Sequence, residues 1–376
     1  MITLSNRAEQ IDDLLDRMAE DIQLDDTRYD RMKAHYEAIK NWIEGDVLFF
    51  KKYKYEIYPH GSVRISTTVK PYGKDEFDLD IALHIKTQWA RHAPAQIYDE
   101  LNRRLKESEI YKPRMELKNR CIRINYSGDF HLDILPGIEE SEYDLDKLRV
   151  PDKERKHWVS SNPRGYAKWF LQKANTVKMS LLEKAIRAEA LPADSFAHKK
   201  PLQRAVQLLK RYRDIYFHGN DEFETSSIVL TTLAGNFYNG EESIFDTVEG
   251  IINAIRKNMA SAPSRIKVLN PVNAQEDFTD KWDGEPRYYQ AFKEFVGHLH
   301  EEWQKLKGDQ GIITEGRILK GLFGDDLLVK AQKSQALITE QLRTSKQLGA
   351  NRSSGILTSA YTAGSGIVKP NTFYGE

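Results

Sequence analysis

The stretch YPHGSVRISTTVKPYGKDEFDLDIAL, residues 58–83, determines how the rest of the chain is interpreted. It begins with the pair Gly61 and Ser62 and ends in an apolar run that is interrupted by Asp78 and Asp80. The two aspartates are two positions apart, so in a β-strand they point to one face while their apolar neighbours point to the core. Adjacent carboxylates raise each other's pKa and disfavour folding unless a cation lies between them. The pattern predicts a metal-binding strand that follows a phosphate-binding loop.

A third carboxylate, Asp133, lies in FHLDIL, residues 130–135, again between apolar neighbours. Its separation from Asp80 leaves room for a helix and another strand. Two Mg²⁺ ions that bind substrate phosphates need such a third ligand near the attacking hydroxyl group. We predict that Asp78, Asp80 and Asp133 hold two Mg²⁺ ions, with Mn²⁺ as the alternative ion, and that the reaction is nucleotidyl transfer. Ordinary strand-edge carboxylates are the competing interpretation.

The Gly-Ser pair is informative only because it lies sixteen positions before Asp78. Glycine lets the backbone approach a phosphate closely, and successive amides form an anion-binding nest. The Ser62 hydroxyl adds one more donor to a triphosphate. His60 precedes the pair, and we interpret it as structural because a two-metal transfer needs no general base.

A later helix, predicted over residues 200–217, has one polar face. That face carries Gln203, Gln207, Lys210 and Asp214. Such a lysine is usually solvated, and its functional alternative is a cation that binds the triphosphate. Ser226 and Ser227 open the next helix, where they could cap the helix or donate to a phosphate. The spacing alone favours capping.

Composition narrows the class of protein. The chain has 376 residues, a net charge of zero and one cysteine. The charge balance argues against a protein built mainly to coat nucleic acid, which would be basic overall. The single cysteine excludes a disulfide framework and suits a reducing cytoplasm. The amphipathic start lacks the features of a signal peptide, and no apolar run approaches the ~18 residues of a membrane span. We expect a soluble, cytoplasmic protein.

The pattern of periodicities predicts an α+β fold with two lobes. Residues 5–47 favour helix, and strands are expected at FDLDIALHI, CIRINY and FHLDIL with a helix over 95–107 between the first two. Helical periods dominate from residue 162, including the segment 178–190. We predict a nucleotidyltransferase lobe of N-terminal helices and catalytic sheet over 1–150, a helical lobe over 151–345 and a flexible tail over 346–376.

Three motifs resemble those of the DNA polymerase beta nucleotidyltransferase superfamily. They are HGS, EFDLD and HLD, at residues 60–62, 76–80 and 131–133. PLQRAVQLLKRYRD and SSIVLTTLAG further resemble the bacterial cGAS/DncV-like nucleotidyltransferases (CD-NTases) of CBASS anti-phage systems, with a lean towards clade G. The resemblance covers about residues 50–300.

The resemblance implies a bilobed enzyme that converts ATP, GTP or other NTPs into a cyclic di- or trinucleotide, which activates a downstream effector. It assigns Gly61 and Ser62 to the triphosphate loop, Lys210 to a triphosphate contact and Ser227 to its companion hydroxyl. The three aspartates become the metal ligands. The chain has no zinc-ribbon cluster of Cys and His, so DNA sensing is not expected.

The chain ends in KPNTFYGE, residues 369–376. The resemblance suggests that Gly375 or Glu376 supplies a carboxylate for conjugation by a ubiquitin-transfer-like enzyme, with Phe373 and Tyr374 as anchors. An ordinary frayed terminus is the alternative. For the whole chain, two other interpretations stay open. One is a linear oligonucleotide synthase or a nucleotidyltransferase acting on a protein or small molecule, and the other is an inactive binding module.

Overall fold

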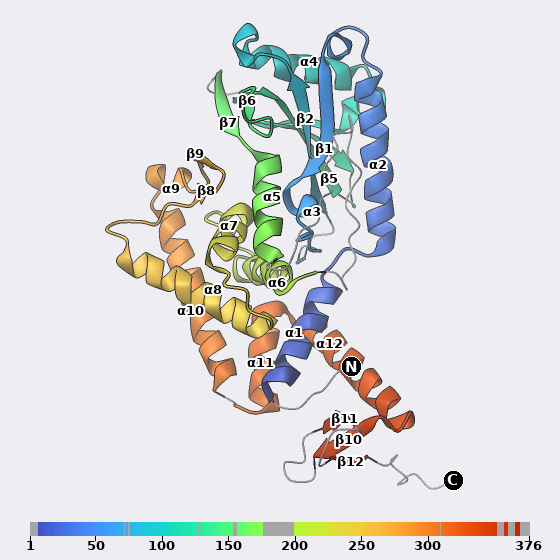
Figure 1. Cartoon of the computed structure of the whole chain (residues 1–376), viewed down its shortest axis with the longest axis vertical. Helices are drawn as coiled ribbons and strands as arrows, with labels where there is room; N and C mark the ends of the chain where they lie inside the picture. Colours follow the sequence, from blue (N-terminus) through green and yellow to red (C-terminus); the bar gives the residue numbers. More distant parts are fainter. Residues whose placement is uncertain are drawn as a thin grey trace.

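The chain folds into two lobes that are stacked along the long axis of the molecule (Figure 1). The computed structural model describes residues 7–368, except 71, 74, 75, 127, 129, 153–155, 176–198, 309, 352–356 and 360–364. One lobe contains a mixed sheet and the other consists mainly of helices, and α5 (Pro163–Ala174) leads from the first to the second. The predicted α+β architecture is confirmed.

Seven strands form the main sheet, in the order β1-β2-β5-β4-β3, with β6 paired to β5 and β7 paired to β6. Their bounds are β1 Lys54–His60, β2 Phe77–Lys86, β3 Met115–Leu117, β4 Ile122–Tyr126, β5 Phe130–Glu139, β6 Leu148–Asp152 and β7 His157–Ser161. β2 and β5 are parallel, whereas the other neighbouring pairs are antiparallel. The sequence predicted β2, β4 and β5 but not the other four strands, which are short or lack a clear alternation.

The sheet lobe is held together by an apolar core between the sheet and two helices, α2 (Asp26–Glu44) and α4 (Pro94–Lys106). The apolar positions of β2 that alternate with the aspartates are completely or almost completely buried in this core. Burial of such side chains contributes about 1.5–3 kcal/mol each. This apolar face fixes the register of β2 and so determines that its aspartates face away from the core.

The helical lobe has its own core, formed by α1 (Arg7–Asp21), α5 and the later helices. Those later helices are α6 Pro201–Tyr216, α7 Ser227–Phe237, α8 Ile244–Ser261, α10 Arg287–Lys307, α11 Ile312–Phe323 and α12 Asp325–Thr344. The first helix buries its apolar face here, on α12, α8 and α6, which differs from the predicted grouping of both N-terminal helices with the sheet. The helix predicted over 178–190 lies outside the described residues.

Short elements complete the described part of the chain. They are α3 Gly61–Arg64, α9 Lys281–Gly284, the hairpin β8 Leu269–Asn270 and β9 Asn273–Asp277, and the 3₁₀ turns Phe50–Lys52, Trp89–Arg91 and Lys112–Arg114. Three further strands, β10 Leu348–Asn351, β11 Leu357–Ser359 and β12 Ser365–Ile367, pair into a small sheet within the segment that the sequence suggested to be irregular. Gly375 and Glu376 lie outside the described residues.

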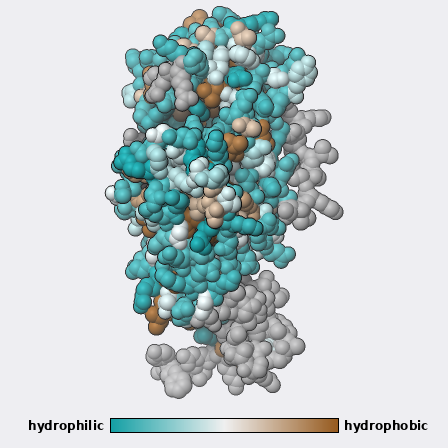
Figure 2. Space-filling view, turned by 90° about the vertical axis from the view of Figure 1, so that its left-hand side faces the viewer, coloured by the Kyte–Doolittle hydropathy of each residue, from teal (hydrophilic) through white to brown (hydrophobic). Residues whose placement is uncertain are grey.

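The surface is mainly polar on the face that Figure 2 shows, where apolar residues occur in small separate groups. Among the helices that the structure describes, none combines the length and the apolar character needed to cross a membrane.

Candidate active site

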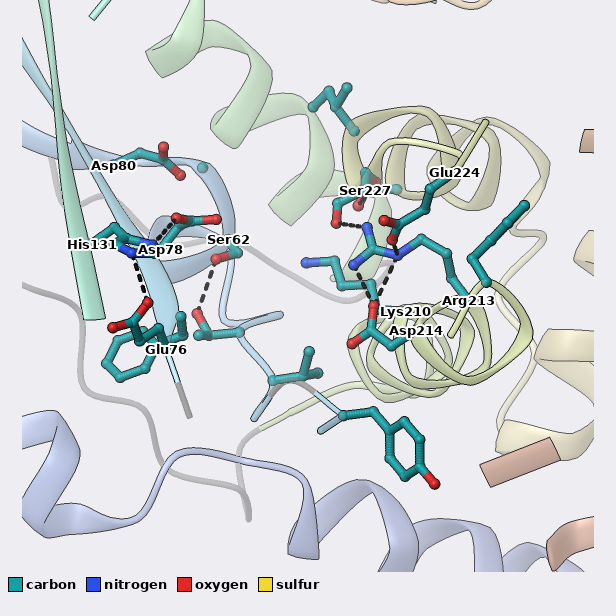
Figure 3. Close-up of a pocket in the computed structure, with 18 of the residues that line it drawn as sticks. Ser62, Glu76, Asp78, Asp80, His131, Lys210, Arg213, Asp214, Glu224 and Ser227 are labelled. Atoms are coloured by element: carbon teal, nitrogen blue, oxygen red, sulfur yellow. Dashed lines mark hydrogen bonds and ion pairs between the residues drawn. The ribbon is translucent and has the colours of Figure 1, made fainter. Parts of the chain in front are cut away.

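A cavity of about 700 Å³ lies between the two lobes. One wall comes from the sheet lobe and carries Ser62, Asp78 and Asp80. The opposite wall comes from α6 and α7 and carries Lys210 and Ser227 (Figure 3). The sequence-predicted phosphate loop and helical-lobe residues therefore face each other across one cavity.

The three predicted metal ligands lie on two adjacent parallel strands. Asp80 on β2 is in register with Asp133 on β5, and Asp78 is two residues earlier on the same face of β2. Burial first, and then the charges of Asp133 and Asp78, raise the pKa of the Asp80 carboxyl to about 8. The sheet thus holds like charges close together, and a cation beside Asp80 would relieve their repulsion.

Arg123 on β4 is the cation that contacts these carboxylates in the structure. Its Nε and Nη2 donate to Oδ1 and Oδ2 of Asp133 at 2.7 and 2.8 Å. Nη2 also donates to Oδ1 of Asp78 at 3.0 Å. These hydrogen bonds, above all those to Asp133, raise the pKa of the guanidinium, which stays charged. One arginine therefore pairs with two of the three predicted ligands.

A histidine extends this polar chain to the rim of the cavity. His131 lies 3.4 Å from Asp78 through Nδ1 and Oδ1, and its Nε2 lies 2.9 Å from Oε2 of Glu76. Figure 3 shows His131 and Glu76 beside Asp78 on the sheet wall. His131 Nδ1 also lies 3.3 Å from Nη1 of Arg123, so Glu76, His131, Asp78 and Arg123 form one connected polar cluster.

The carboxylates suit a hard divalent cation by their chemistry, because Mg²⁺ and Mn²⁺ prefer carboxylate and phosphate oxygens. Their arrangement is not yet that of a closed site: within the described residues no three His, Cys, Asp or Glu side chains are placed to hold one ion together. Asp133 and Asp78 instead contact Arg123. A cation that binds these oxygens must displace part of this ion pairing.

Both the backbone conformation at residue 61 and the nearby Asp80 side chain require glycine at this position. Its φ is +60°, in the left-handed region that favours glycine. A Cβ atom at this position would collide with Oδ2 of Asp80 and would lie 3.0 Å from its Cγ. The Gly-Ser turn therefore passes directly over β2 at Asp80. The next hydroxyl, that of Ser62, accepts from Oγ1 of Thr68 at 3.2 Å.

On the opposite wall Lys210 is buried, with 4% of its surface exposed. Its Nζ donates to the carbonyl oxygen of Thr67 at 2.9 Å and lies 3.1 Å from Oγ1 of the same residue. Burial, and then the charge of Arg213, lower the pKa of the Lys210 ammonium to about 7. The lysine is therefore not an ordinary solvated side chain; it lines the cavity and contacts the loop after Ser62.

Ser227 is the first residue of α7, and its hydroxyl accepts from Nη1 of Arg213. Ser226 occupies the N-cap position, but its side chain makes no capping hydrogen bond, which corrects the expectation that the spacing favours. Arg213 also pairs with Asp214 at 2.5 Å and with Glu224 at 2.7 Å. Ser227 thus belongs to a charged cluster on the helical wall.

Arg123 and Arg213 are site residues that the sequence interpretation missed. Arg123 had a readable signal: β4 and β5 are separated by only three positions in the sequence, and counting back along the antiparallel pair places Arg123 opposite Asp133. Arg213 had none, because two of its partners, Ser227 and Glu224, lie on α7 and in the loop before α7.

Comparisons of sequence identify proteins that are similar along the whole chain. The family model described as the second messenger oligonucleotide or dinucleotide synthetase domain matches residues 10–175. A c-di-GMP synthase of Roseivirga ehrenbergii is 44% identical over 100% of both chains. A cyclic dinucleotide synthase of Bradyrhizobium diazoefficiens, CdnG, is 25% identical over 95% of this chain and 90% of that protein.

Comparisons of structure give the same fold. The B. diazoefficiens CD-NTase CdnG, solved in complex with GTP, superposes with a TM-score of 0.70 at 22% identity, covering 87% of this chain and 99% of that one. Escherichia coli DncV, solved with 3′-deoxy GTP, superposes with a TM-score of 0.59 at 15% identity over 82% and 93% of the two chains.

Proposed function

This chain belongs to the bacterial CD-NTase family, and on that premise we propose that it condenses two molecules of GTP into cyclic di-GMP. It is a nucleotidyltransferase that makes a cyclic dinucleotide. The choice of GTP rests on the 44% identical relative, which is a c-di-GMP synthase. A cyclic dinucleotide is a second messenger by nature, so a downstream effector that binds it is the expected partner.

One observation carries the proposal: Asp78 and Asp80 of β2 face Lys210 and Ser227 across a single cavity, and Asp133 of β5 is in register with Asp80. A nucleoside triphosphate needs cationic and hydrogen-bond donors for its phosphates and carboxylates for its cations. We assign Gly61, Ser62, Lys210 and Ser227 to the phosphates, and Asp78, Asp80 and Asp133 to two Mg²⁺ ions. Members of this family act with divalent cations.

The chain's own residues then do the following. The Gly61 turn brings backbone amides close to the triphosphate of the donor nucleotide, and Ser62 donates to it. Lys210, freed from Thr67, neutralises phosphate charge as pyrophosphate develops. Asp78, Asp80 and Asp133 orient the acceptor hydroxyl in line with the donor's α-phosphorus. When bound, divalent cations lower the pKa of that hydroxyl and neutralise the leaving pyrophosphate.

The first step forms a phosphodiester bond between the acceptor's 2′- or 3′-oxygen and the α-phosphorus, breaks the bond to the β-phosphate oxygen and releases pyrophosphate and a proton. The linear dinucleotide retains one triphosphate. In the second step, a 2′- or 3′-hydroxyl of the nucleotide that has lost its pyrophosphate attacks the α-phosphorus of the retained triphosphate. The new phosphodiester bond closes the ring, and a second pyrophosphate and a proton are released. Both steps use the same carboxylates and the same phosphate wall.

The test is to incubate the purified chain with each radiolabelled NTP, alone and in pairs, with Mg²⁺, and then to treat the products with phosphatase. We expect a phosphatase-resistant spot with GTP alone that is not strengthened by ATP. A ladder of phosphatase-sensitive products would support a linear synthase, and label on protein would support a protein nucleotidyltransferase. Either result, or no product with any nucleotide, would overturn the proposal.

A further inference from the structure

The loop after Ser62, residues 65–68, is bound by a row of donors from the other lobe. Gln203 Nε2 donates to the carbonyl oxygen of Ile65 at 2.9 Å, and Gln207 Nε2 donates to that of Thr68 at 2.8 Å. Lys210 Nζ donates to the carbonyl oxygen of Thr67 at 2.9 Å. Because these residues are spaced by four and three, all three donors lie on one face of α6.

These bonds are formed in a dry environment. Gln203 and Gln207 are 6% and 0% exposed. A buried amide costs free energy unless it is hydrogen-bonded, and removal of its partner leaves the full desolvation cost. A loop conformation that breaks the hydrogen bonds to Gln203 and Gln207 would leave their buried amides without these partners. Such a conformation is therefore disfavoured.

The loop itself needs such support. Ser66, at its centre, has φ +55°, a left-handed conformation that costs a non-glycine residue about 1 kcal/mol or more. The two residues that follow this position connect back to the phosphate-binding serine. The Thr67 amide donates to the Ser62 carbonyl oxygen at 2.9 Å, and Thr68 Oγ1 donates to Ser62 Oγ at 3.2 Å.

We propose that Gln203 and Gln207 are positioning residues of the triphosphate site. They hold loop 65–68 in its strained conformation, and Gln207, which bonds Thr68, thereby orients the Ser62 hydroxyl. This inference rests on the proposed function, since it assumes that Ser62 binds a triphosphate. It deepens that function by naming how the helical lobe sets the geometry of a loop on the sheet lobe.

Lys210 differs from Gln203 and Gln207 in its expected response to a bound nucleotide. When a nucleotide binds, Lys210 turns from Thr67 to the phosphates, which removes one of the three bonds to the loop. The side-chain amides of Gln203 and Gln207 carry no charge, so the phosphates do not attract them. They retain their hydrogen bonds to Ile65 and Thr68. The loop can therefore lose the lysine without losing its conformation.

The experiment measures the affinity of Gln207→Met for two probes by calorimetry with Mg²⁺ present. Methionine is close to glutamine in size but has no amide donor. We expect the Kd of a non-hydrolysable GTP analogue to rise about fivefold, the effect of one buried hydrogen bond. The Kd of guanosine, which has no phosphates, stays unchanged. Thr68→Val, which cuts the link to Ser62 from the loop side, should give the same split.

The matched control is Gln335→Met on α12, which removes an amide bond to Asp13 of 2.9 Å far from the cavity. It should lower the melting temperature without changing either Kd. If folded Gln207→Met and Thr68→Val bind the analogue like the wild type, or lose guanosine and analogue equally, the positioning role is wrong while the proposed function stands. If the wild type itself does not bind the analogue, both are overturned.

Discussion

Arg123 and Asp133 form a two-point ion pair directly across the β4–β5 ladder, with Nε–Oδ1 and Nη2–Oδ2 distances of 2.7 and 2.8 Å. The same guanidinium reaches Asp78 at 3.0 Å. Three oxygens of two carboxylates that we assign to metal binding are thus paired with a protein cation. A divalent ion and Arg123 must compete for them.

This competition predicts the behaviour of Arg123→Gln. Without the guanidinium, Asp78 and Asp133 lose their counter-charge, so the protein in EDTA should be less stable and should bind Mn²⁺ more tightly, by about fivefold or more. Mn²⁺ titration followed by electron paramagnetic resonance measures the affinity directly. Arg120→Gln, in the turn between β3 and β4 and without a bond to these carboxylates, is the control. Equal or weaker Mn²⁺ binding by Arg123→Gln would argue that the arginine assists the metal.

Gly61→Ala tests the contact between the Gly-Ser turn and Asp80 on β2. An alanine Cβ would collide with Asp80, so either the loop or the carboxylate must move, and we expect product formation to fall about a hundredfold or more. Gly311→Ala is the matched control, because Gly311 also has a positive φ, +82°, but its added Cβ meets nothing within 4 Å. Both variants place an alanine at a positive φ. A similar loss of activity in the two would mean that strain, and not the collision, is responsible.

The Asp80 carboxyl predicts how stability depends on pH without metal. Its pKa is raised to about 8 in the folded protein, against an ordinary value of 3.8. Between these values the folded state holds a proton that the unfolded state has released, so this group's stabilising contribution is present below pH 4 and is lost as the pH rises to 8. Asp80→Asn cannot titrate and should remove this slope.

The measurement is thermal unfolding in EDTA from pH 5 to 8.5. We expect Asp80→Asn to melt several degrees above the wild type at pH 8.5, with the difference shrinking towards pH 5. Saturating Mg²⁺ should reverse the order at high pH, because only the wild type offers the carboxylate. Parallel curves in EDTA would show that Asp80 titrates normally.

Lys210→Met tests the helical wall. Loss of a buried ammonium that binds phosphate should raise the KM for GTP at least tenfold, the effect expected for a charge-assisted bond. Steady-state pyrophosphate release gives KM and kcat together. Lys307→Met, which removes a 2.8 Å ion pair with Glu249 at the surface, should leave both unchanged. If the KM is unaltered in Lys210→Met, the lysine does not bind the phosphates, and its role is limited to the hydrogen bond with Thr67.

The local features of the site could be predicted from the sequence, whereas the contacts between lobes could not. Alternation in FDLDIAL fixes which face of β2 carries Asp78 and Asp80, because burial of the apolar face allows no other register. The place of Arg123 follows from hairpin counting once the turn is recognised. By contrast, the helical spacing places Gln207 on the polar face of α6. It does not show that the partner of Gln207 is the Thr68 carbonyl oxygen.

The first helix illustrates the same limit. Its amphipathic pattern predicts a buried face, yet that pattern does not say which of two apolar cores receives it. In the structure Leu15 and Met18 are completely buried in the core of the helical lobe. Only the packing of distant segments decides such a choice.

The most direct test of the central proposal is mass spectrometry of the phosphatase-treated product formed from GTP and Mg²⁺. We predict one species with the mass and fragmentation of cyclic di-GMP, and none from the folded double variant Asp78→Asn with Asp80→Asn. A wild-type product that is only linear or contains no guanine, or undiminished synthesis by the double variant, would contradict it.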